Sequence, residues 1–236
     1  MWQLAAMVLA AVYPHGGLLL ASPWEAALRL GALALTAPFW AAVGRSALRI
    51  LGGFLLSCVL AAVLAALAAW RGWVRELLAP LVAAAKAVPV VSFIILALVW
   101  LDAASLPLFI SALMVFPPVY LNVLAGIAQA DRSLLEMARV YRVPFRRTFR
   151  GIWLPQVLPH FRSAVSLALG LCWKAGVAAE VIGLPAGTIG ERLYTAKVYF
   201  LTPDLFAWTA VLVAAAAVFE RLFLGGVDLL ARKAGC

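Results

Sequence analysis

The sequence has 236 residues, of which 66% are hydrophobic and only 12% charged, and its mean hydropathy is +1.04. Soluble proteins have about a quarter of their residues charged, so this composition excludes a water-soluble domain and indicates an integral membrane protein. The net charge of +9 would suggest nucleic-acid binding in a soluble protein. In a membrane protein, basic residues gather on the cytoplasmic side, and the chain has no nucleic-acid motif, so we expect no nucleic-acid partner.

The first 49 residues are predicted to form one membrane span and an interfacial region. Residues 1–20 are apolar and have the length of a span or of a signal peptide. A signal peptide begins with positive charges, whereas the first basic residue here is Arg29, so we expect a retained span. Residues 22–49 contain charges, prolines, Trp24 and Trp40, which are typical of one or two helices at the outer membrane interface.

Five further apolar segments follow. Residues 50–70 contain no charge and would extend about 30 Å as a helix, which is enough to cross a bilayer. Four others are interrupted by single polar residues or prolines but keep the length of a span: residues 77–101, 106–128, 155–180 and 205–224. The sequence therefore predicts an all-α integral membrane protein of about six transmembrane helices. We expect a single domain over residues 1–236, with its core spans within 50–228.

The loop at residues 131–155 is the most basic part of the chain. If it is cytoplasmic, twelve lysines and arginines lie inside and five outside, with Lys86 and Lys174 within spans. Basic residues accumulate in cytoplasmic loops, so this bias places the loop and both termini in the cytoplasm. Residues 133–142 have the apolar spacing of a short amphipathic helix, and Ser133 with Glu136 has the spacing of a capping box. Pro144 is expected to end that helix, because the residue before a proline avoids the α conformation.

The same loop carries a recognisable pattern. Glu136-Met137-Ala138 is followed at a fixed distance by Ile152-x-Leu154-Pro155. The pattern resembles the E-A-A, three residues, glycine, nine residues, I-x-L-P loop of permease subunits of binding-protein-dependent ABC importers. Arg142 stands at the glycine position. A basic loop that only sets membrane topology would explain the arginines but not this spacing.

The resemblance implies the fold of a type I ABC importer permease, in which this loop contains a coupling helix that docks on a separate ATPase. The residues that it assigns to ATPase coupling are Glu136, Ala138, Arg139, Arg142, Ile152, Leu154 and Pro155. The chain itself has no G-x-x-x-x-G-K-[ST] phosphate-binding loop, so we expect it not to be an enzyme and ATP hydrolysis to belong to the partner.

Polar residues and a proline inside the predicted spans mark a candidate translocation pathway, because an ionisable group there costs about 2.5–3.5 kcal/mol on insertion scales. They are Lys86, Pro89, Asn122, Lys174 and Glu180. Lys86 could attract an anion in a pathway, or it could be a structural lysine that pairs or reaches the interface. Glu180 could be a gate or pathway group, or an interfacial acid. Asn122 also suits a hydrogen bond between helices.

Three of these stretches are similar to permeases of the sulfonate, taurine and nitrate importer group. They are Lys86-Ala87-Val88-Pro89, Pro118 with Asn122, and Trp173 with Val177-Ala178-Ala179-Glu180. That group has arginine where this chain has Lys86. The resemblance implies a small organic or inorganic anion as the solute, although members also import vitamin-precursor-like molecules. It further implies two permease copies, two ATPase subunits and an extracytoplasmic solute-binding protein, in the lipid of a bacterial inner membrane.

Two other classes find little support in the sequence. A secondary transporter would be built from two related halves with broken helices, which we do not find in this chain. Metal or cofactor chemistry is not expected, because the three cysteines form no C-x-x-C and the two histidines are far apart.

Overall fold

The computed structural model describes residues 20–234, together with Gln3 and Val12, and of residues 230–234 only the backbone. The described residues form helices and connections, with no strand among them. The helices are α3 (Pro23–Ala34), α4 (Ala37–Trp70), α5 (Gly72–Ala87), α6 (Val90–Ala97), α7 (Leu106–Ala128), α8 (Arg132–Val140), α9 (Phe145–Thr148), the π-helix η1 (Phe149–Trp153), α10 (Leu154–Gly183), α11 (Ile189–Val198) and α12 (Thr202–Ala234). The predicted all-α fold is confirmed.

Four stretches of the described residues are long and apolar enough to cross a membrane. They are α4, α7, Phe145–Gly183 and Thr202–Leu229. The pair α5 and α6, bent by 107°, would be a fifth if it forms one broken span. These stretches correspond to the five predicted segments between residues 50 and 224. The expected first span, at residues 1–20, lies outside the described residues.

The start of the second predicted span, at residue 50, is wrong. Residues 37–49, which we expected in an interfacial helix, are the first part of α4, which continues to Trp70. Arg45 and Arg49 made this stretch look interfacial, but they lie one helical turn apart and occupy one side of the helix only. The adjoining side is buried and includes Phe39, Ala42, Ser46 and Ile50. The charges therefore do not interrupt the helix.

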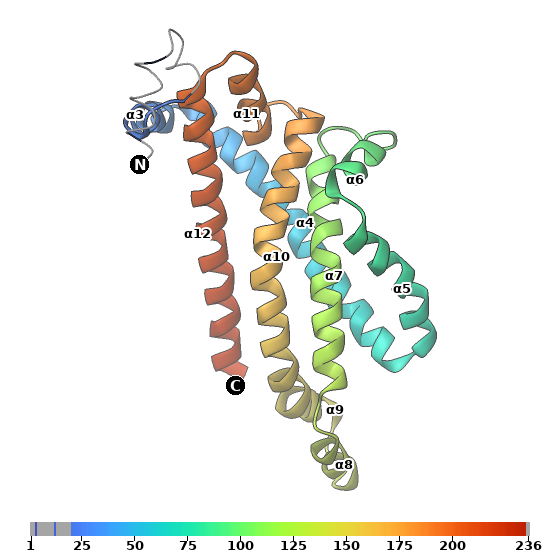
Figure 1. The fold of residues 1–236 in the computed structure, drawn as a ribbon. Coiled ribbons are helices and arrows are strands. Elements are labelled where there is room, and N and C mark those ends of the chain that lie inside the picture. Colours follow the sequence, from blue (N-terminus) through green and yellow to red (C-terminus); the bar gives the residue numbers. More distant parts are fainter. Residues whose placement is uncertain (1–2, 4–11, 13–19, 235–236) are drawn as a thin grey trace.

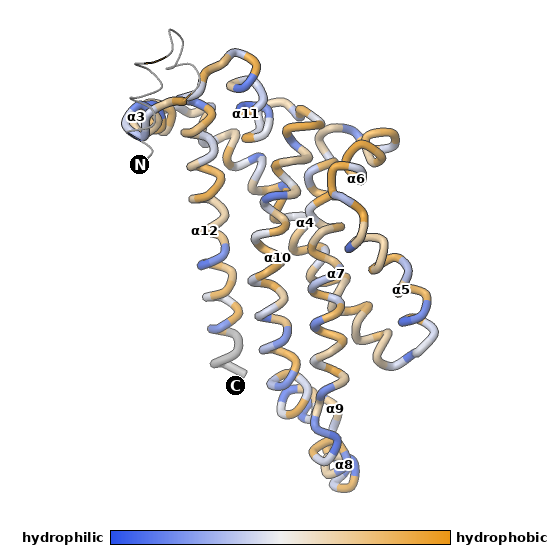
Figure 2. The backbone as a smooth tube through the Cα atoms, in the orientation of Figure 1, coloured by the Kyte–Doolittle hydropathy of each residue, from blue (hydrophilic) through white to orange (hydrophobic). Residues whose placement is uncertain are grey.

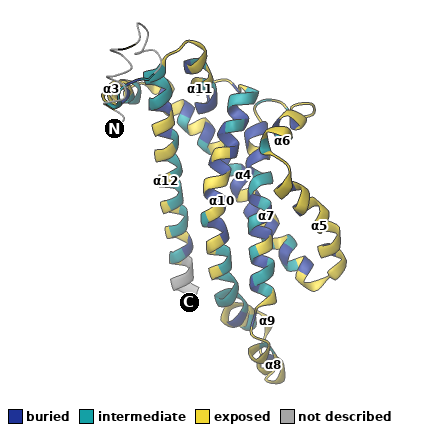
Figure 3. Cartoon of the chain, viewed as in Figure 1, coloured by how far each residue is buried: buried dark blue, intermediate teal, exposed yellow. Residues whose placement is uncertain are grey.

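The core consists of α4, α7 and α10, whose buried residues lie on the sides that face one another (Figure 3). Close approach depends on small residues, as is usual in membrane helix packing. A Cβ added to Gly53 would overlap the Leu108 carbonyl, and one added to Gly176 would lie 2.6 Å from the Ile50 side chain. The Ser57 hydroxyl also donates to the Ala112 carbonyl at 2.8 Å, which joins α4 to α7.

The spans run between two ends of the molecule (Figure 1). The helices α8 and α9 and the C-terminal part of α12 lie at one end, and α3, α6 and α11 lie at the other. Apolar residues dominate the spans, whereas polar residues gather around α8 (Figure 2). The outer side of α12 is largely exposed, and its polar contacts reach α3 through Arg29–Asp204 and α10 through Arg162–Asp228.

Candidate functional site

The N-cap of the short helix α8 lies two residues earlier than the capping-box pattern, with Ser133 as N-cap, predicts. Its N-cap is Asp131, whose carboxylate accepts from the Ser133 backbone N–H at 2.8 Å and from the Ser133 hydroxyl at 2.7 Å. The hydrogen bond from that hydroxyl is the main reason why the pKa of Asp131 is lowered. The Asp131 backbone N–H donates to the Gln156 side chain at 2.7 Å, so the start of α8 is tied to the start of α10.

The C-terminus of α8 explains the departure at the glycine position. Arg142 has φ 51°, in the left-handed region that glycine adopts at helix ends. The Arg142 N–H donates to the Arg139 carbonyl at 3.1 Å, and the Val143 N–H donates to the Ala138 carbonyl at 2.8 Å. These two bonds define a Schellman motif. The backbone therefore keeps the conformation that suits a glycine, although an arginine side chain is attached to it.

The two sides of α8 face different surroundings. Ala138 is 4% exposed and lines an open hollow of about 410 Å³ on the loop, with Leu135, Glu136, Arg139, Val143, Phe145, Thr148 and Trp153. Met137, Val140 and Tyr141 point outward, and the last two are 78% and 77% exposed. Sequence reasoning grouped Ala138 and Tyr141 on one apolar side and missed Met137 and Val140. Their helical spacing was a usable signal, because residues three and four apart share a face.

The second half of the loop leads directly into α10. Pro144 is the N-cap of α9, which is followed by η1, and Pro155 occupies the first turn of α10, where a missing N–H costs little. Ile152 is buried, whereas Leu154 and Pro155 are partly buried. The I-x-L-P part of the pattern thus joins the loop to a span. A π-helix at this junction is notable, because such turns are frequent at functional sites.

The arginines of the loop are exposed, and within residues 20–229 none of them forms an ion pair. They are Arg132, Arg139, Arg142, Arg146, Arg147 and Arg150. Glu136 is exposed as well and is the one acidic residue of α8. The surface of the loop is therefore strongly positive.

Two of the predicted pathway residues meet in a cavity among α5, α7 and α10. The cavity has a volume of about 440 Å³, and Lys86 and Asn122 line it together with Ala85, Met114, Pro117, Pro118, Leu121 and Leu171. The Asn122 side-chain amide donates to the Pro118 carbonyl at 2.8 Å, within α7. We considered a hydrogen bond between two helices for Asn122, whereas this bond lies within one helix.

Pro117 and Pro118 line the cavity as well. They have no N–H, so the carbonyls of Leu113 and Met114 lack their usual helical donors. Among the residues that line the cavity, Lys86 and Asn122 are the two with polar side chains.

The other pathway residues lie elsewhere. Lys174 is exposed on α10, one turn beyond Leu171 of the cavity. Pro89 does not line the cavity and stands at the bend between α5 and α6. Its position agrees with a proline that breaks a span.

The side chain of Glu180 is fully buried among the helices. Its Oε2 accepts from the Ser46 hydroxyl at 2.8 Å and from the Gly190 N–H at 3.0 Å. The Ser46 oxygen accepts in turn from the Ile189 N–H at 2.9 Å. Glu180 therefore connects α10 with α4 and with the start of α11, and it does not line the Lys86 cavity. A pathway role for Glu180 stays a prediction.

Apolar spans around a cavity that contains a lysine and an asparagine, with a charged helical loop at one end, are the arrangement of a membrane transport subunit. The model of the family described as "Binding-protein-dependent transport system inner membrane component" matches residues 58–234. The chain belongs to this family, whose members have the type I ABC permease fold.

Relatives with printed functions are permeases as well. A probable ABC transporter permease protein of Brucella melitensis is 29% identical over 81% of this chain and 78% of its own length. A putative aliphatic sulfonates transport permease protein of Bacillus subtilis is 32% identical over 77% of this chain and 64% of its own. A riboflavin transport system permease protein of Chloroflexus aurantiacus is 30% identical over 59% of this chain and 52% of its own. The chain is thus an ABC importer permease subunit, and ATP hydrolysis belongs to a separate subunit.

Proposed function

We propose that this permease subunit carries a small organic or inorganic anion through the cavity that contains Lys86. The observation that carries the proposal is a lysine on an open cavity between spans, with no ion pair among the described residues. Ionisable groups within membrane segments usually serve solute or ion pathways. Lys174 adds a second exposed positive charge on the adjacent part of α10.

The proposal extends to the assembly. Two copies of the permease enclose the pathway, two ATPase subunits bind the loops around α8, and an extracytoplasmic solute-binding protein delivers the solute. The C-terminal part of α12 lies at the same end as α8, which agrees with a cytoplasmic C-terminus if the basic loop is cytoplasmic (Figure 1). The residues proposed for coupling are those of the loop pattern, to which the structure adds the exposed Met137, Val140 and Tyr141.

The solute class rests on charge and on the relatives. A sulfonate permease at 32% identity supports an anion such as a sulfonate, taurine or nitrate. A riboflavin permease at 30% identity supports a second candidate, a vitamin-precursor-like molecule. The Lys86 cavity favours the first class, because a cation in a membrane cavity attracts anions.

The test is uptake in proteoliposomes by the whole complex, which consists of the permease, its partner ATPase and its solute-binding protein. Alkanesulfonates, taurine, nitrate and riboflavin are offered separately, with and without ATP. We expect ATP-dependent accumulation of at least one anion. Accumulation of riboflavin alone would overturn the anion class but keep the transporter, whereas ATP-independent uptake driven by an ion gradient would overturn both.

A further inference from the structure

The backbone at Arg142 adopts a left-handed conformation that the coupling role of the loop does not explain. Its φ of 51° is a conformation that non-glycine residues adopt at a cost in free energy, and glycine would adopt it freely. The family pattern has glycine here. Leu184 and Phe200 have a similar φ, but Arg142 alone of the three lies in the loop proposed for coupling, so its side chain motivates a hypothesis of function.

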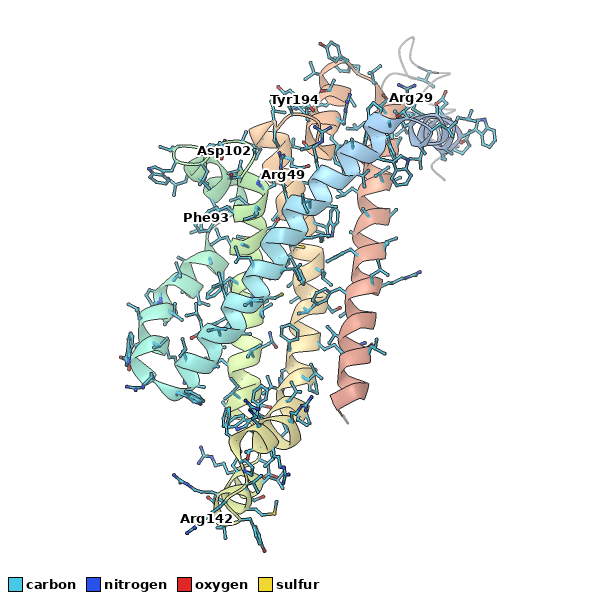
Figure 4. All side chains as sticks on the ribbon, turned by 180° about the vertical axis from the view of Figure 1, so that it is seen from behind. Arg29, Arg49, Phe93, Asp102, Arg142 and Tyr194 are labelled. Carbon is cyan, nitrogen blue, oxygen red and sulfur yellow. The ribbon has the colours of Figure 1, made fainter. Side chains whose placement is uncertain are left out.

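No contact of the Arg142 side chain within the described part of the subunit offsets this cost in free energy. Arg142 is exposed, and among the described residues its guanidinium takes part in no hydrogen bond or ion pair that would fix it. Figure 4 places it at the far tip of the molecule, on the turn after α8. Its position at the C-terminal end of a helix suits a positive charge in general, but Arg139 already occupies the last turn.

The surroundings of Arg142 point to a protein surface. Arg142 follows the exposed apolar side chains of Val140 and Tyr141, and Met137 lies one turn earlier on the same side of α8. Arg139 is also exposed but lies on the other side of α8, at the hollow lined by Ala138. An apolar patch with a charged edge is typical of a protein–protein contact. Lipid headgroups are a poorer match, because α8 projects beyond the ends of α7 and α10 and the tip lies farthest from the spans (Figure 1).

We propose that Arg142, together with Arg139, binds acidic side chains at the edge of the groove on the ATPase and thereby selects the ATPase with which this permease pairs. This inference rests on the proposed function, in which α8 docks on an ATPase. The apolar residues supply contact area, and the two arginines supply charge complementarity, which sets partner choice and association rate more than area does. An ATPase without acidic groups at that edge would leave both guanidinium groups unpaired.

The substitution Arg142→Gly separates the charge from the fold. It removes the guanidinium group and also the free-energy cost of the left-handed backbone conformation at residue 142. A loss of binding therefore cannot be attributed to a damaged loop. We expect association with the neighbouring ATPase to weaken about fivefold at low ionic strength and to depend less on salt than in the wild type. Arg142→Lys, which keeps the charge, should retain most of the affinity.

Phe200→Gly is the matched control. Phe200 has φ 54° and ends α11 with the same pair of hydrogen bonds, Phe200 N–H to Lys197 and Leu201 N–H to Ala196, at the opposite end of the molecule. It should leave ATPase association unchanged. Binding is measured on the full permease in nanodiscs, by titration with the purified ATPase.

The possible results separate the two proposals. If the wild-type permease does not bind the ATPase, the proposed function fails, and this inference fails with it. If the wild type binds and Arg142→Gly binds equally well with the same salt dependence, only this inference is overturned. It is also overturned if Arg142→Gly leaves ATPase binding unchanged but lowers binding to phosphatidylglycerol vesicles, because the partner of Arg142 would then be lipid.

Discussion

Lys86 and Glu180 are both ionisable residues of predicted spans, yet the structure gives them different surroundings. Lys86 is exposed on a cavity with Asn122, whereas Glu180 is buried and accepts hydrogen bonds from Ser46 and Gly190. The difference depends on residues far away in the sequence, since Ser46 is on α4. Their positions in the sequence show that both residues cost free energy on insertion into a membrane. They do not distinguish a pathway group from a group that connects helices.

Substitution of Lys86 tests the pathway. Lys86→Met keeps most of the bulk and removes the charge, so we expect uptake of the anionic solute to fall about tenfold, because a charge-assisted contact is lost. Assembly with the ATPase should be unaffected. Lys197→Met, an exposed lysine of α11 outside the cavity, is the control. Normal uptake by Lys86→Met would leave this lysine with a structural role only.

Gly190 tests the connection that Glu180 makes. A Cβ at this position would overlap the Glu180 Cβ and lie 2.7 Å from its backbone carbonyl carbon, so Gly190→Ala must separate α11 from α10. We expect a loss of about 1–3 kcal/mol in stability, which is typical of overpacking. Gly44→Ala, in a helix with open space around it, should be neutral or stabilising. Thermal unfolding in detergent compares the two, and equal transition temperatures would contradict the tight contact.

At the scale of elements, the pattern of prolines and charges predicted α8 and its end before Pro144, because proline acts locally on the backbone. It predicted residues 77–101 as one span, whereas the structure has two helices, α5 and α6, that meet at Pro89 with a bend of 107°. The pattern did not predict the start of α4, because Arg45 and Arg49 suggested an interfacial segment where the structure has a continuous helix. The buried side of that helix depends on packing against the rest of the protein. The pattern also failed for the side of α8 that contains Ala138. That side is decided by Phe145 and Trp153, which fold back over it from α9 and η1.

The two sides of α8 give separable predictions. Val140→Asp puts a charge on the exposed side, so we expect weaker ATPase association with an intact loop. Ala138→Asp puts a charge at a buried position on the side of α8 that faces α9 and η1, and we expect both weaker association and a less stable loop.

Pull-down of the ATPase and limited proteolysis of the loop distinguish these effects, and uptake per ATP hydrolysed reports coupling. Should both variants associate and transport like the wild type, this loop would not be the coupling element.

At the scale of the whole molecule, the spans run between two ends (Figure 1), and the charge bias predicts which end faces the cytoplasm. Arg142 and Asp102 lie at opposite ends (Figure 4). The connection between α6 and α7, which contains Asp102, should therefore be extracytoplasmic if α8 is cytoplasmic. The order of the spans was predictable from hydropathy, because each span is long and apolar. Their packing was not, because it depends on contacts such as that of Gly53 with Leu108.

Cysteine labelling tests this orientation in one experiment. Cys58 and Cys172 are buried and can be replaced by alanine to give a silent background. Ala104→Cys, on the α6–α7 connection, should then react with a membrane-impermeant maleimide in intact spheroplasts, because residue 104 is exposed. Ser133→Cys on α8 and the natural Cys236, which follows α12 in the sequence, should react only after permeabilisation, since α8 and the C-terminal part of α12 lie at the end that carries the excess of arginine. If Cys236 reacts in intact spheroplasts while Ser133→Cys does not, the C-terminus is not on the side of α8, and the orientation argued from the arrangement of α12 is wrong. If Ser133→Cys reacts in intact spheroplasts, the basic loop is outside and has no access to a cytoplasmic ATPase, so the coupling role proposed for α8 is overturned as well.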